Sequence, residues 1–404
     1  MENPKIRFKG FTKDWEQRKF GELYSKVSEK NDLSFGADKI ISVANMYFKE
    51  EVKESSDEYM RTYNVMRLGD IAFEGNKSKN YSHGRFVENT IGDGIVSHVF
   101  DVFRPTTSYD LLFWKYLINN EGVMGRIMAR CTNASTMMTN LVASDFLKEK
   151  ILVPSLKEQK KIGAYFDSLD HLITLHQRKC DQTKNLKKYM LQKMFPQNGA
   201  KVPEIRFDGY TYDWEQRRFG EITELKSASR VHKDEWTSNG VPFYRSSDVM
   251  TAINGTENEK AFISEELYEK LSKVSGKLEE GDILVTGGGS VGNPYIVPDN
   301  KPLYTKDADL LWIKNKGKFH PYFLYEFFFS PTFRNYLGSI SHVGTIAHYT
   351  ITQLSDTPIG LPIFEEQKEV GEYFQSLDRL ITLHQRKCDE LKKMKKYMLQ
   401  NMFI

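Results

Sequence analysis

The strongest constraint on this chain is that it contains the same sequence frame twice. Residues 4–22 (PKIRFKGFTKDWEQRKFGE) return at 203–221 (PEIRFDGYTYDWEQRRFGE), and residues 154–195 return at 362–403. The offset grows from 199 to 208 residues between these two segments, so the intervening insert is nine residues longer in the second copy. The inserts also differ in sequence. A duplicated frame predicts two halves related by a pseudo-twofold axis, and dissimilar inserts predict that the halves recognise different things.

Length and composition exclude several protein classes. The chain has 404 residues, 40% hydrophobic and 13% aromatic, which is typical of a globular protein of two or three domains. Its longest apolar runs, such as residues 111–114, are too short for a membrane span, and no signal peptide follows Met1. Cys131, Cys180 and Cys388 form no C-x-x-C pair. We therefore expect a cytoplasmic, reduced protein without a membrane segment or a zinc site.

Charge alone says little about the partner. The net charge is +3, with 57 basic and 54 acidic residues. Residues 157–201 carry ten Lys or Arg against four Asp or Glu, whereas the second copy of that segment is nearly balanced. This distribution permits a polyanionic partner without requiring one.

Two long helices are predicted within the spacer segments 154–200 and 362–404; Pro154 and Ser155 precede the first, and Pro196 with Gly199 ends it. Apolar residues recur there at steps of three and four, and neither copy has an internal proline. Forty residues of helix would extend roughly 60 Å, which favours a spacer over an ordinary long core helix, although the core helix stays open as an alternative. We expect the two copies to pack antiparallel as a coiled coil. The predicted seam residues are Tyr165, Phe166, Leu169, Leu172 and Ile173, with Tyr373, Phe374, Leu377, Leu380 and Ile381.

The remaining segments, 1–153 and 201–361, are predicted to be mixed α/β domains that include the repeated frames. Residues 69–71 and 281–283 both read Gly-Asp-Ile, a turn followed by a strand. Helices near residues 109–128 and 321–337 should cover one side of a curved sheet. The predicted fold class is α/β (α+β): two pseudo-twofold-related mixed domains joined by two long antiparallel helices.

No catalytic motif has the context that its chemistry needs. Residues 287–292 match G-x-G-x-x-G, but a dinucleotide site requires a helix to follow, and here two prolines follow within residues 293–298. The chain has no phosphate-binding G-x-x-x-x-G-K-[ST], no H-E-x-x-H and no G-x-S-x-G. We expect no catalytic residue, no metal site and no cofactor in this chain.

A set of weak motifs occurs in a fixed order, and the order of frame, variable domain and helix occurs twice. The motifs are residues 14–21 and 213–220, Gly281–Leu284, Gly344-Thr345 leading to Leu361-Pro362, and Glu365–Gln367 opening a helix. Taken together, this set resembles the specificity (S) subunit of type I restriction-modification enzymes over essentially the whole chain. The first insert departs from the pattern, because residues 74–78 (EGNKS) replace the glycine-rich turn of the second.

The resemblance implies a noncatalytic role in reading DNA. Each variable domain would be a target recognition domain for one half of an asymmetric, split sequence in double-stranded DNA. The paired helices would set the gap and dock two methyltransferase subunits, which use S-adenosylmethionine to methylate adenine at N6. Restriction subunits would join them and cleave DNA with ATP and Mg.

Candidate DNA-binding residues follow from the chemistry of readout: forked donors and acceptors on loops for bases, and basic or hydroxyl groups for phosphates. The alternative for each residue is a solvated surface side chain. In the first domain they are Asn76, Lys77, Ser78, Lys79, Asn80, Tyr81, His83, Arg85, Asn133, Ser135 and Thr136. In the second they are Ser229, Arg230, Lys233, Tyr244, Arg245, Ser246, Ser247, Ser290, Asn293, Tyr295, Thr345, His348 and Tyr349.

Two other function classes remain open from the sequence. A structural adaptor that binds protein partners would show no sequence-dependent DNA affinity at physiological salt. A self-contained DNA methyltransferase or nuclease would need the methyl-donor or metal motifs that the chain lacks.

Overall fold

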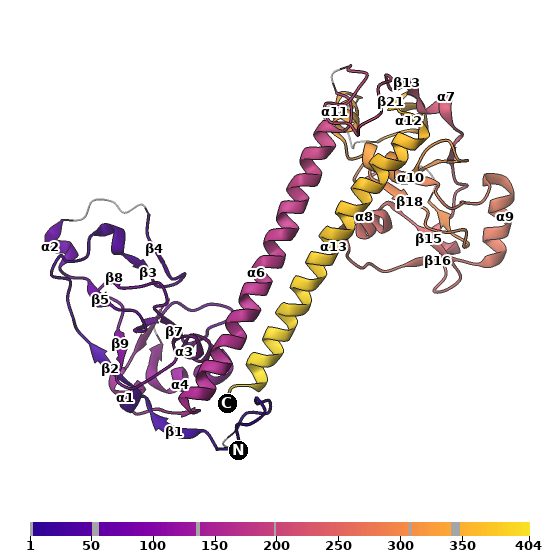
Figure 1. The fold of residues 1–404 in the computed structure, drawn as a ribbon. Helices are drawn as coiled ribbons and strands as arrows, with labels where there is room; N and C mark the ends of the chain where they lie inside the picture. The colour runs from indigo at the N-terminus through magenta and orange to yellow at the C-terminus, as the bar shows by residue number, and fades with distance from the viewer. Residues whose placement is uncertain (1–2, 51–55, 135–137, 198, 307–308, 341–347) are drawn as a thin grey trace. The chain divides into compact units, whose positions relative to one another are not determined.

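The computed structural model describes residues 3–50, 56–134, 138–197, 199–306, 309–340 and 348–404 (Figure 1). The chain forms two compact units. Unit 1 comprises Met1–Gln177 with Gln385–Ile404, and unit 2 comprises Arg178–His384. Each unit therefore contains one variable domain and a part of both long helices.

Unit 1 is built on a four-stranded antiparallel sheet in the order β2-β9-β6-β7. Its strands are β2 (Tyr24–Val27), β9 (Val102–Pro105), β6 (Ile71–Glu74) and β7 (Arg85–Glu88). Two-stranded ribbons surround it: β1 (Glu16–Lys19) with β12 (Lys150–Val153), β3 (Ile41–Ser42) with β4 (Tyr47–Phe48), β5 (Asn64–Met66) with β8 (Gly94–Val96), and β10 (Thr132–Ala134) with β11 (Thr139–Leu141). The helices are α1 (Phe20–Leu23), α2 (Asp57–Met60), α3 (Leu111–Ile118), α4 (Glu121–Cys131), α5 (Ala143–Phe146) and the start of α6 (Leu156–Lys193).

Unit 2 has a corresponding four-stranded sheet in the order β14-β20-β17-β18. Its strands are β14 (Leu225–Ser227), β20 (Leu310–Ile313), β17 (Ile283–Thr286) and β18 (Pro294–Ile296), and β16 (Ala261–Ile263), β15 (Val241–Tyr244) and β19 (Tyr304–Thr305) form a second sheet. β13 (Glu215–Arg218) pairs with β21 (Pro358–Leu361). The helices are α7 (Phe219–Ile222), α8 (Ser246–Asn254), α9 (Glu265–Ser275), α10 (Pro321–Phe327), α11 (Pro331–Ile340), α12 (Ile351–Asp356) and α13 (Phe364–Asn401). The predicted mixed α/β class is confirmed.

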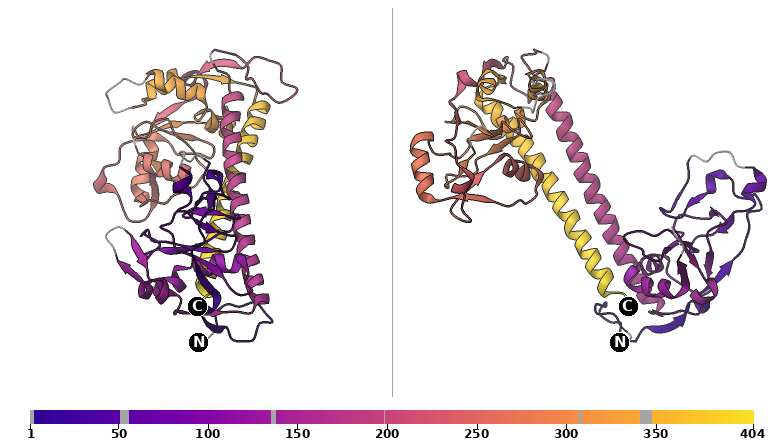
Figure 2. Two further views of the ribbon diagram at one scale, coloured as in Figure 1. Left: turned by 90° about the vertical axis from the view of Figure 1, so that its left-hand side faces the viewer. Right: turned by 180° about the vertical axis from the view of Figure 1, so that it is seen from behind.

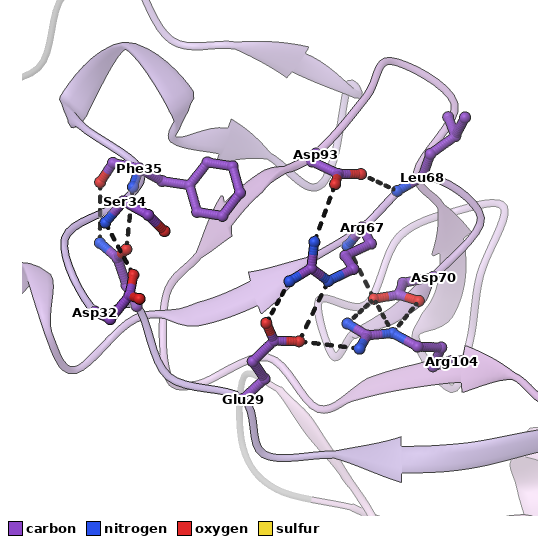
Figure 3. A network of polar contacts seen from close by, with 10 residues as sticks. Glu29, Asp32, Ser34, Phe35, Arg67, Leu68, Asp70, Asp93 and Arg104 are labelled. Atoms are coloured by element: carbon purple, nitrogen blue, oxygen red, sulfur yellow. Dashed lines mark hydrogen bonds and ion pairs between the residues drawn. The ribbon is translucent and has the colours of Figure 1, made fainter.

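The repeated Gly-Asp-Ile turn is a structural device in both units. Gly69 and Gly281 adopt φ of +88° and +84°, which favours glycine. The carboxylate of buried Asp70 accepts a hydrogen bond from the backbone amide of Arg67 at 2.9 Å. It also forms an ion pair with Arg104 at 2.9 Å, and Figure 3 shows both contacts. Its counterpart Asp282 accepts hydrogen bonds from the Trp312 indole and the Asn315 amide. Each carboxylate therefore fixes the turn that opens a central strand, β6 or β17.

The repeated frame also holds each variable domain against its long helix. Arg7 bonds Glu158 at 2.6 and 2.8 Å near the start of α6, and Arg206 bonds Glu366 in the same way near the start of α13. Gly163 lies where α3 approaches α6, because a Cβ there would come within 2.7 Å of the Phe113 nitrogen. In each arginine–glutamate pair both side chains are charged, and two hydrogen bonds join them. The pair therefore fixes the orientation of the frame on the helix as well as stabilising the contact.

Within each unit, α6 and α13 run antiparallel and side by side (Figures 1 and 2). In unit 1, Asp170 pairs with Lys395 at 2.5 Å, and the thiol of Cys388 lies 3.9 Å from the Ile173 carbonyl. The same contacts, shifted by the 208-residue repeat, occur in unit 2: Asp378 with Lys187 at 2.6 Å, and Cys180 with Ile381 at 3.8 Å. The repeat thus pairs each helix with its own copy.

The predicted seam residues divide into three groups, and partly buried Ile173 and Ile381 belong with the packed ones. Phe166, Leu169, Phe374 and Leu377 are buried, while Tyr165 and Tyr373 contact the frame residues Phe8 and Phe207 edge-on. Leu172 and Leu380 are instead 40% and 44% exposed, so they lie outside the packed seam of this chain. They remain available to a partner.

The C-terminal end of α13 packs in the core of unit 1, and the C-terminal end of α6 packs in the core of unit 2. Phe403, just after α13, packs against Phe113 and Phe166 of unit 1 at ring distances of 5.7 and 5.6 Å. Phe195, just after α6, packs against Phe323 of unit 2 at 5.4 Å. Unit 1 is therefore assembled from residues more than 200 positions apart in the chain. No helix in the described part of the chain is long and apolar enough to cross a membrane.

Candidate nucleic-acid interface

In unit 1, the candidate residues of the first domain gather on the loop that joins β6 to β7. The Ser78 hydroxyl shapes its tip, because it accepts the amides of Asn80 and Tyr81 at 3.3 and 3.2 Å. The candidate residues with exposed side chains on this loop are Asn76, Lys77, Ser78, Lys79 and Asn80. An exposed polar loop on a rigid sheet is well placed to present its side chains to a partner.

Arg85 and Tyr81 fix the base of this loop. The Arg85 Nε donates to Glu74 at 2.8 Å, and its Nη2 donates to the Ala44 carbonyl at 2.6 Å. The same guanidinium lies 5.0 Å from the centre of the Tyr81 ring, and the Tyr81 hydroxyl donates to the Asn119 carbonyl at 3.4 Å. These two side chains are engaged within the protein, so they position the loop, with half-buried His83 beside them.

In unit 2, three candidate residues lie at the start of α8. Arg245 is held by the Asp248 carboxylate, with its Nε at 2.8 Å, and Ser246 donates to the Asp309 carbonyl at 3.0 Å. Ser247 is exposed. The engaged pair therefore orients the helix end, and Ser247 is free to face a partner.

Two tyrosines join this helix end to β18. The Tyr244 and Tyr295 rings lie 5.1 Å apart, and their hydroxyls are 3.4 Å apart. Burial and the hydrogen bond to Tyr244 raise the pKa of Tyr295. Tyr295 therefore stays protonated at neutral pH; its hydroxyl donates to Tyr244, and its oxygen can still accept.

The glycine-rich segment forms a turn between β17 and β18, and a strand follows it where a dinucleotide site would need a helix. Asn293 closes the turn by donating to the Ser290 carbonyl at 2.7 Å, and Arg334 donates to Asn293 at 2.9 Å. Exposed His348 lies beside the turn, with its Nδ1 3.9 Å from where a Cβ of Gly288 would be. Ser290, Asn293 and His348 therefore lie around one turn. The sequence predicts each of them as a separate candidate and does not predict that they lie close together.

The prediction that Tyr349 binds DNA is corrected by its burial. Its side chain is 1% exposed in the core of unit 2, and its hydroxyl bonds Thr357. It was a plausible candidate because it follows a polar, glycine-containing stretch, but a buried ring at this position supports the sheet and cannot contact DNA directly.

The other candidates are scattered. The Ser229 amide and hydroxyl bond Ser275, while Arg230 and Lys233 are exposed next to it in sequence. Asn133 is exposed in β10. Ser135, Thr136 and Thr345 lie outside the residues that the structure describes.

Several residues that shape these surfaces have no local sequence signal. Arg334 is a single basic residue in the cover helix α11, and burial lowers its pKa. In unit 1, Tyr81 lines a groove of about 1160 Å³ that also contains Lys5, Lys115 and Lys392. These lysines come from three distant segments of the chain, so only the fold brings them together.

The described ranges contain no group of three or more His, Cys, Asp or Glu residues placed to hold a metal ion. All three cysteines are buried, and burial raises the pKa of Cys131 to about 12. A thiol with that pKa is a poor nucleophile at neutral pH.

Comparison with known proteins gives an independent finding. A family described as "Type I restriction modification DNA specificity domain" matches the chain twice, over residues 12–185 and 212–393. The specificity subunit of the type I restriction enzyme MjaVIII from Methanocaldococcus jannaschii is 26% identical over 258 residues, which is 61% of this chain and 59% of that one. A putative specificity subunit from Haemophilus influenzae is 26% identical over 40% of each chain. The match therefore spans less than two thirds of both relatives.

A third relative and two solved structures extend over nearly the whole chain. The putative MjaX specificity subunit of M. jannaschii is 23% identical, covering 95% of this chain and 91% of that one. The crystal structure of the type I restriction-modification S subunit from M. genitalium has a TM-score of 0.58 at 15% identity, covering 100% and 99%. That of the HsdS subunit from Thermoanaerobacter tengcongensis has a TM-score of 0.51 at 17% identity, covering 96% of each. At these identities the structures show a shared fold.

Proposed function

Because this chain belongs to the type I restriction-modification DNA specificity family, we propose that it is the noncatalytic subunit that selects the DNA sequence for such an enzyme. The observation that carries the proposal is the duplication: one frame, built twice, holds two different polar surfaces. Each unit reads one part of the target. Since the two surfaces differ, the target is asymmetric and bipartite, with a fixed number of unread bases between its parts.

The first surface is the β6–β7 loop. Asn76 and Asn80 offer amide groups, which pair with adenine edges, and Lys79 offers a cation for a phosphate or for guanine. The second surface combines Ser247, the Ser290–Asn293 turn and His348. Hydroxyl, amide and imidazole groups there can donate and accept, which base-edge readout requires.

The partners we propose are two methyltransferase subunits, joined by restriction subunits in the full enzyme. S-adenosylmethionine would belong to the former, and ATP with Mg to the latter. Support comes from exposed apolar side chains at equivalent positions of the repeat: Leu186 and Tyr189 on α6, and Met394 and Tyr397 on α13. Large apolar groups that recur on both helices mark a surface for a partner present in two copies.

The experiment that tests sequence selection is mapping of adenine methylation in a methylation-free host. The chain is expressed together with the methyltransferase encoded next to it. The methylated sequences are compared with those found when the methyltransferase is expressed alone. We expect a new two-part motif only when the chain is present. If the complex assembles and no motif appears, the chain is an adaptor and the proposal is wrong.

Variants then assign each half of the motif to one unit. Asn76→Ala with Asn80→Ala should relax one half, and Ser247→Ala with His348→Ala should relax the other, by about 1–3 kcal/mol for each lost base contact. Lys270→Ala, on the exposed face of α9, is the matched control and should change neither. If one pair of substitutions relaxed both halves together, the assignment of one reader to each unit would fail.

Docking has a separate readout. Leu186→Glu with Tyr189→Glu, and Met394→Glu with Tyr397→Glu, should each remove one methyltransferase subunit from the complex, as counted by native mass spectrometry. Retention of two subunits by both variants would exclude this surface.

A further inference from the structure

The two copies of the frame differ in charge at one place in unit 1. Lys9, Lys157, Lys160 and Lys161 line a pocket of about 470 Å³ together with Gly10 and Phe11. The four lysines are exposed. They come from the frame segment and from the first turns of α6, so two elements meet to build one basic surface, which we call the lysine cluster.

The second copy carries the opposite charge at the equivalent positions. Lys9, Lys157 and Lys161 correspond to Asp208, Glu365 and Glu369, and only Lys160 keeps its sign, as Lys368. Four positive charges therefore stand where the repeat has three negative charges and one positive. The surrounding residues are nearly identical, so the shared fold does not require lysine at these positions.

The lysines also oppose the local preferences of the helix. A cation in the first turn interacts unfavourably with the helix dipole, and Lys157 lies there, whereas the second copy has Glu365. Among the described residues no carboxylate forms an ion pair with Lys9, Lys157 or Lys160, and Lys161 lies 5.1 Å from the centre of the Phe8 ring. Cations that stand in an unfavourable position and have no carboxylate partner within the protein indicate an anionic ligand.

Further lysines of unit 1 line the groove beside the first reading surface. Tyr81, at the base of the β6–β7 loop, shares its groove with Lys5, Lys392 and Lys396. Lys5 lies four residues before Lys9 in the frame, and its counterpart in the second copy is again acidic, Glu204. The groove also contains Glu121 and Asp170, and Asp170 pairs with Lys395, so the frame segment supplies one lysine to a groove of mixed charge and one to the lysine cluster.

We infer that the lysine cluster binds phosphates of the DNA backbone and gives the first half of the target a sequence-independent grip that the second half lacks. The inference rests on the proposed function. Flexible lysines spread over two elements suit a row of phosphates, since a single bound anion is more often held by forked arginines or by backbone amides.

An acidic segment of a protein partner is less consistent with the repeat. A partner that docks twice on the duplicated frame would meet a basic surface on one copy and an acidic surface on the other. DNA has no such constraint, because its sequence and its path past the two units are not repeated.

The test exchanges the cluster for the residues of the second copy: Lys9→Asp, Lys157→Glu and Lys161→Glu. The fold accepts these residues in unit 2, and acids favour the first turn of a helix, so the thermal midpoint should not fall. DNA affinity of the chain assembled with its methyltransferase is measured from 50 to 300 mM salt, on a duplex with the target motif and on one without it. Each phosphate contact contributes about 0.9 to the slope of log K against log salt.

We expect the slope to become shallower by about 2 to 3 on both duplexes, with the ratio between them unchanged, because phosphate contacts carry no sequence information. An unchanged slope would overturn the inference. Loss of methyltransferase subunits with the slope intact would also overturn it, in favour of a protein partner.

A control variant carries the same change in net charge on the exposed surface of unit 2: Lys270→Glu, Lys273→Glu and Lys301→Asp. It should leave the slope unchanged, and an equal effect would show that net charge alone is responsible and refute the lysine cluster. Failure of the proposed function is distinguishable, since it appears as a wild-type complex that methylates no two-part motif, whatever its salt slope.

Discussion

Because the end of α13 packs in the core of unit 1, a substitution near the C-terminus should destabilise the unit that contains the N-terminal domain. Phe403 is 4% exposed and lies between Phe113 and Phe166 of unit 1. Phe403→Ala should cost about 3–5 kcal/mol, because it removes a buried ring and leaves a cavity among residues that are already packed. For a unit of about 200 residues this corresponds to a fall in thermal midpoint of roughly 6–20 °C.

The assay is hydrogen exchange followed by mass spectrometry, because a chain with two units is not required to unfold in one step. Peptides from β6 and β9 should lose protection in Phe403→Ala, while peptides from β17 and β20 keep it. Phe195→Ala should give the reverse pattern. Tyr397→Ala, at a 57% exposed position on the same helix, is the control and should stay within about 0.5 kcal/mol of the wild type.

The reasoning would be refuted if Phe403→Ala left the protection of unit 1 unchanged, or if it lowered both units equally. The first result would mean that the end of α13 adds little to the core of unit 1. The second would mean that stability is not divided between the units that the contacts define.

Three further predictions follow from single sites. Burial raises the pKa of Glu88 to about 9, and its carboxylate has no hydrogen-bond partner in the described structure. The contribution of Glu88 to stability is therefore greatest below its unfolded pKa of about 4.5 and declines by up to about 1.4 kcal/mol per pH unit toward pH 9, so the loss of stability between pH 6 and pH 8 in urea titrations should be smaller in Glu88→Gln than in the wild type, and an equal loss would contradict it. The three buried cysteines should resist a thiol reagent in the native chain and react only in denaturant; rapid reaction would contradict their burial. Gly163→Val should lower the thermal midpoint, because its Cβ meets the Phe113 nitrogen at 2.7 Å, whereas Gly338→Ala in α11 meets nothing within 4 Å and should raise stability by about 0.4–1 kcal/mol; equal effects would contradict the close approach at Gly163.

The sequence by itself determined the duplicated plan, the two long helices and the mixed α/β class. These features depend on periodicity and on short turn signals, and such signals survive without knowledge of neighbours. The Gly-Asp-Ile turns were predictable for the same reason, since the glycine φ and the backbone amide bond to each aspartate are local to the turn, whereas the pairing with Arg104 and Trp312 is not. The polar loop at residues 76–80 could also be located, although its contacts with DNA stay a prediction.

Only the tertiary structure decided which of these residues meet. Tyr349 follows a polar stretch in sequence yet is buried, and Leu172 continues the helical stripe yet faces outward, because burial depends on what packs against a residue from elsewhere in the chain. The structure likewise placed Phe403 in the core of unit 1 and set Lys9 beside Lys157. A periodic pattern identifies the apolar face of a helix, but the partner of that face, and the charges that gather on one surface, are fixed by contacts between residues more than a hundred positions apart.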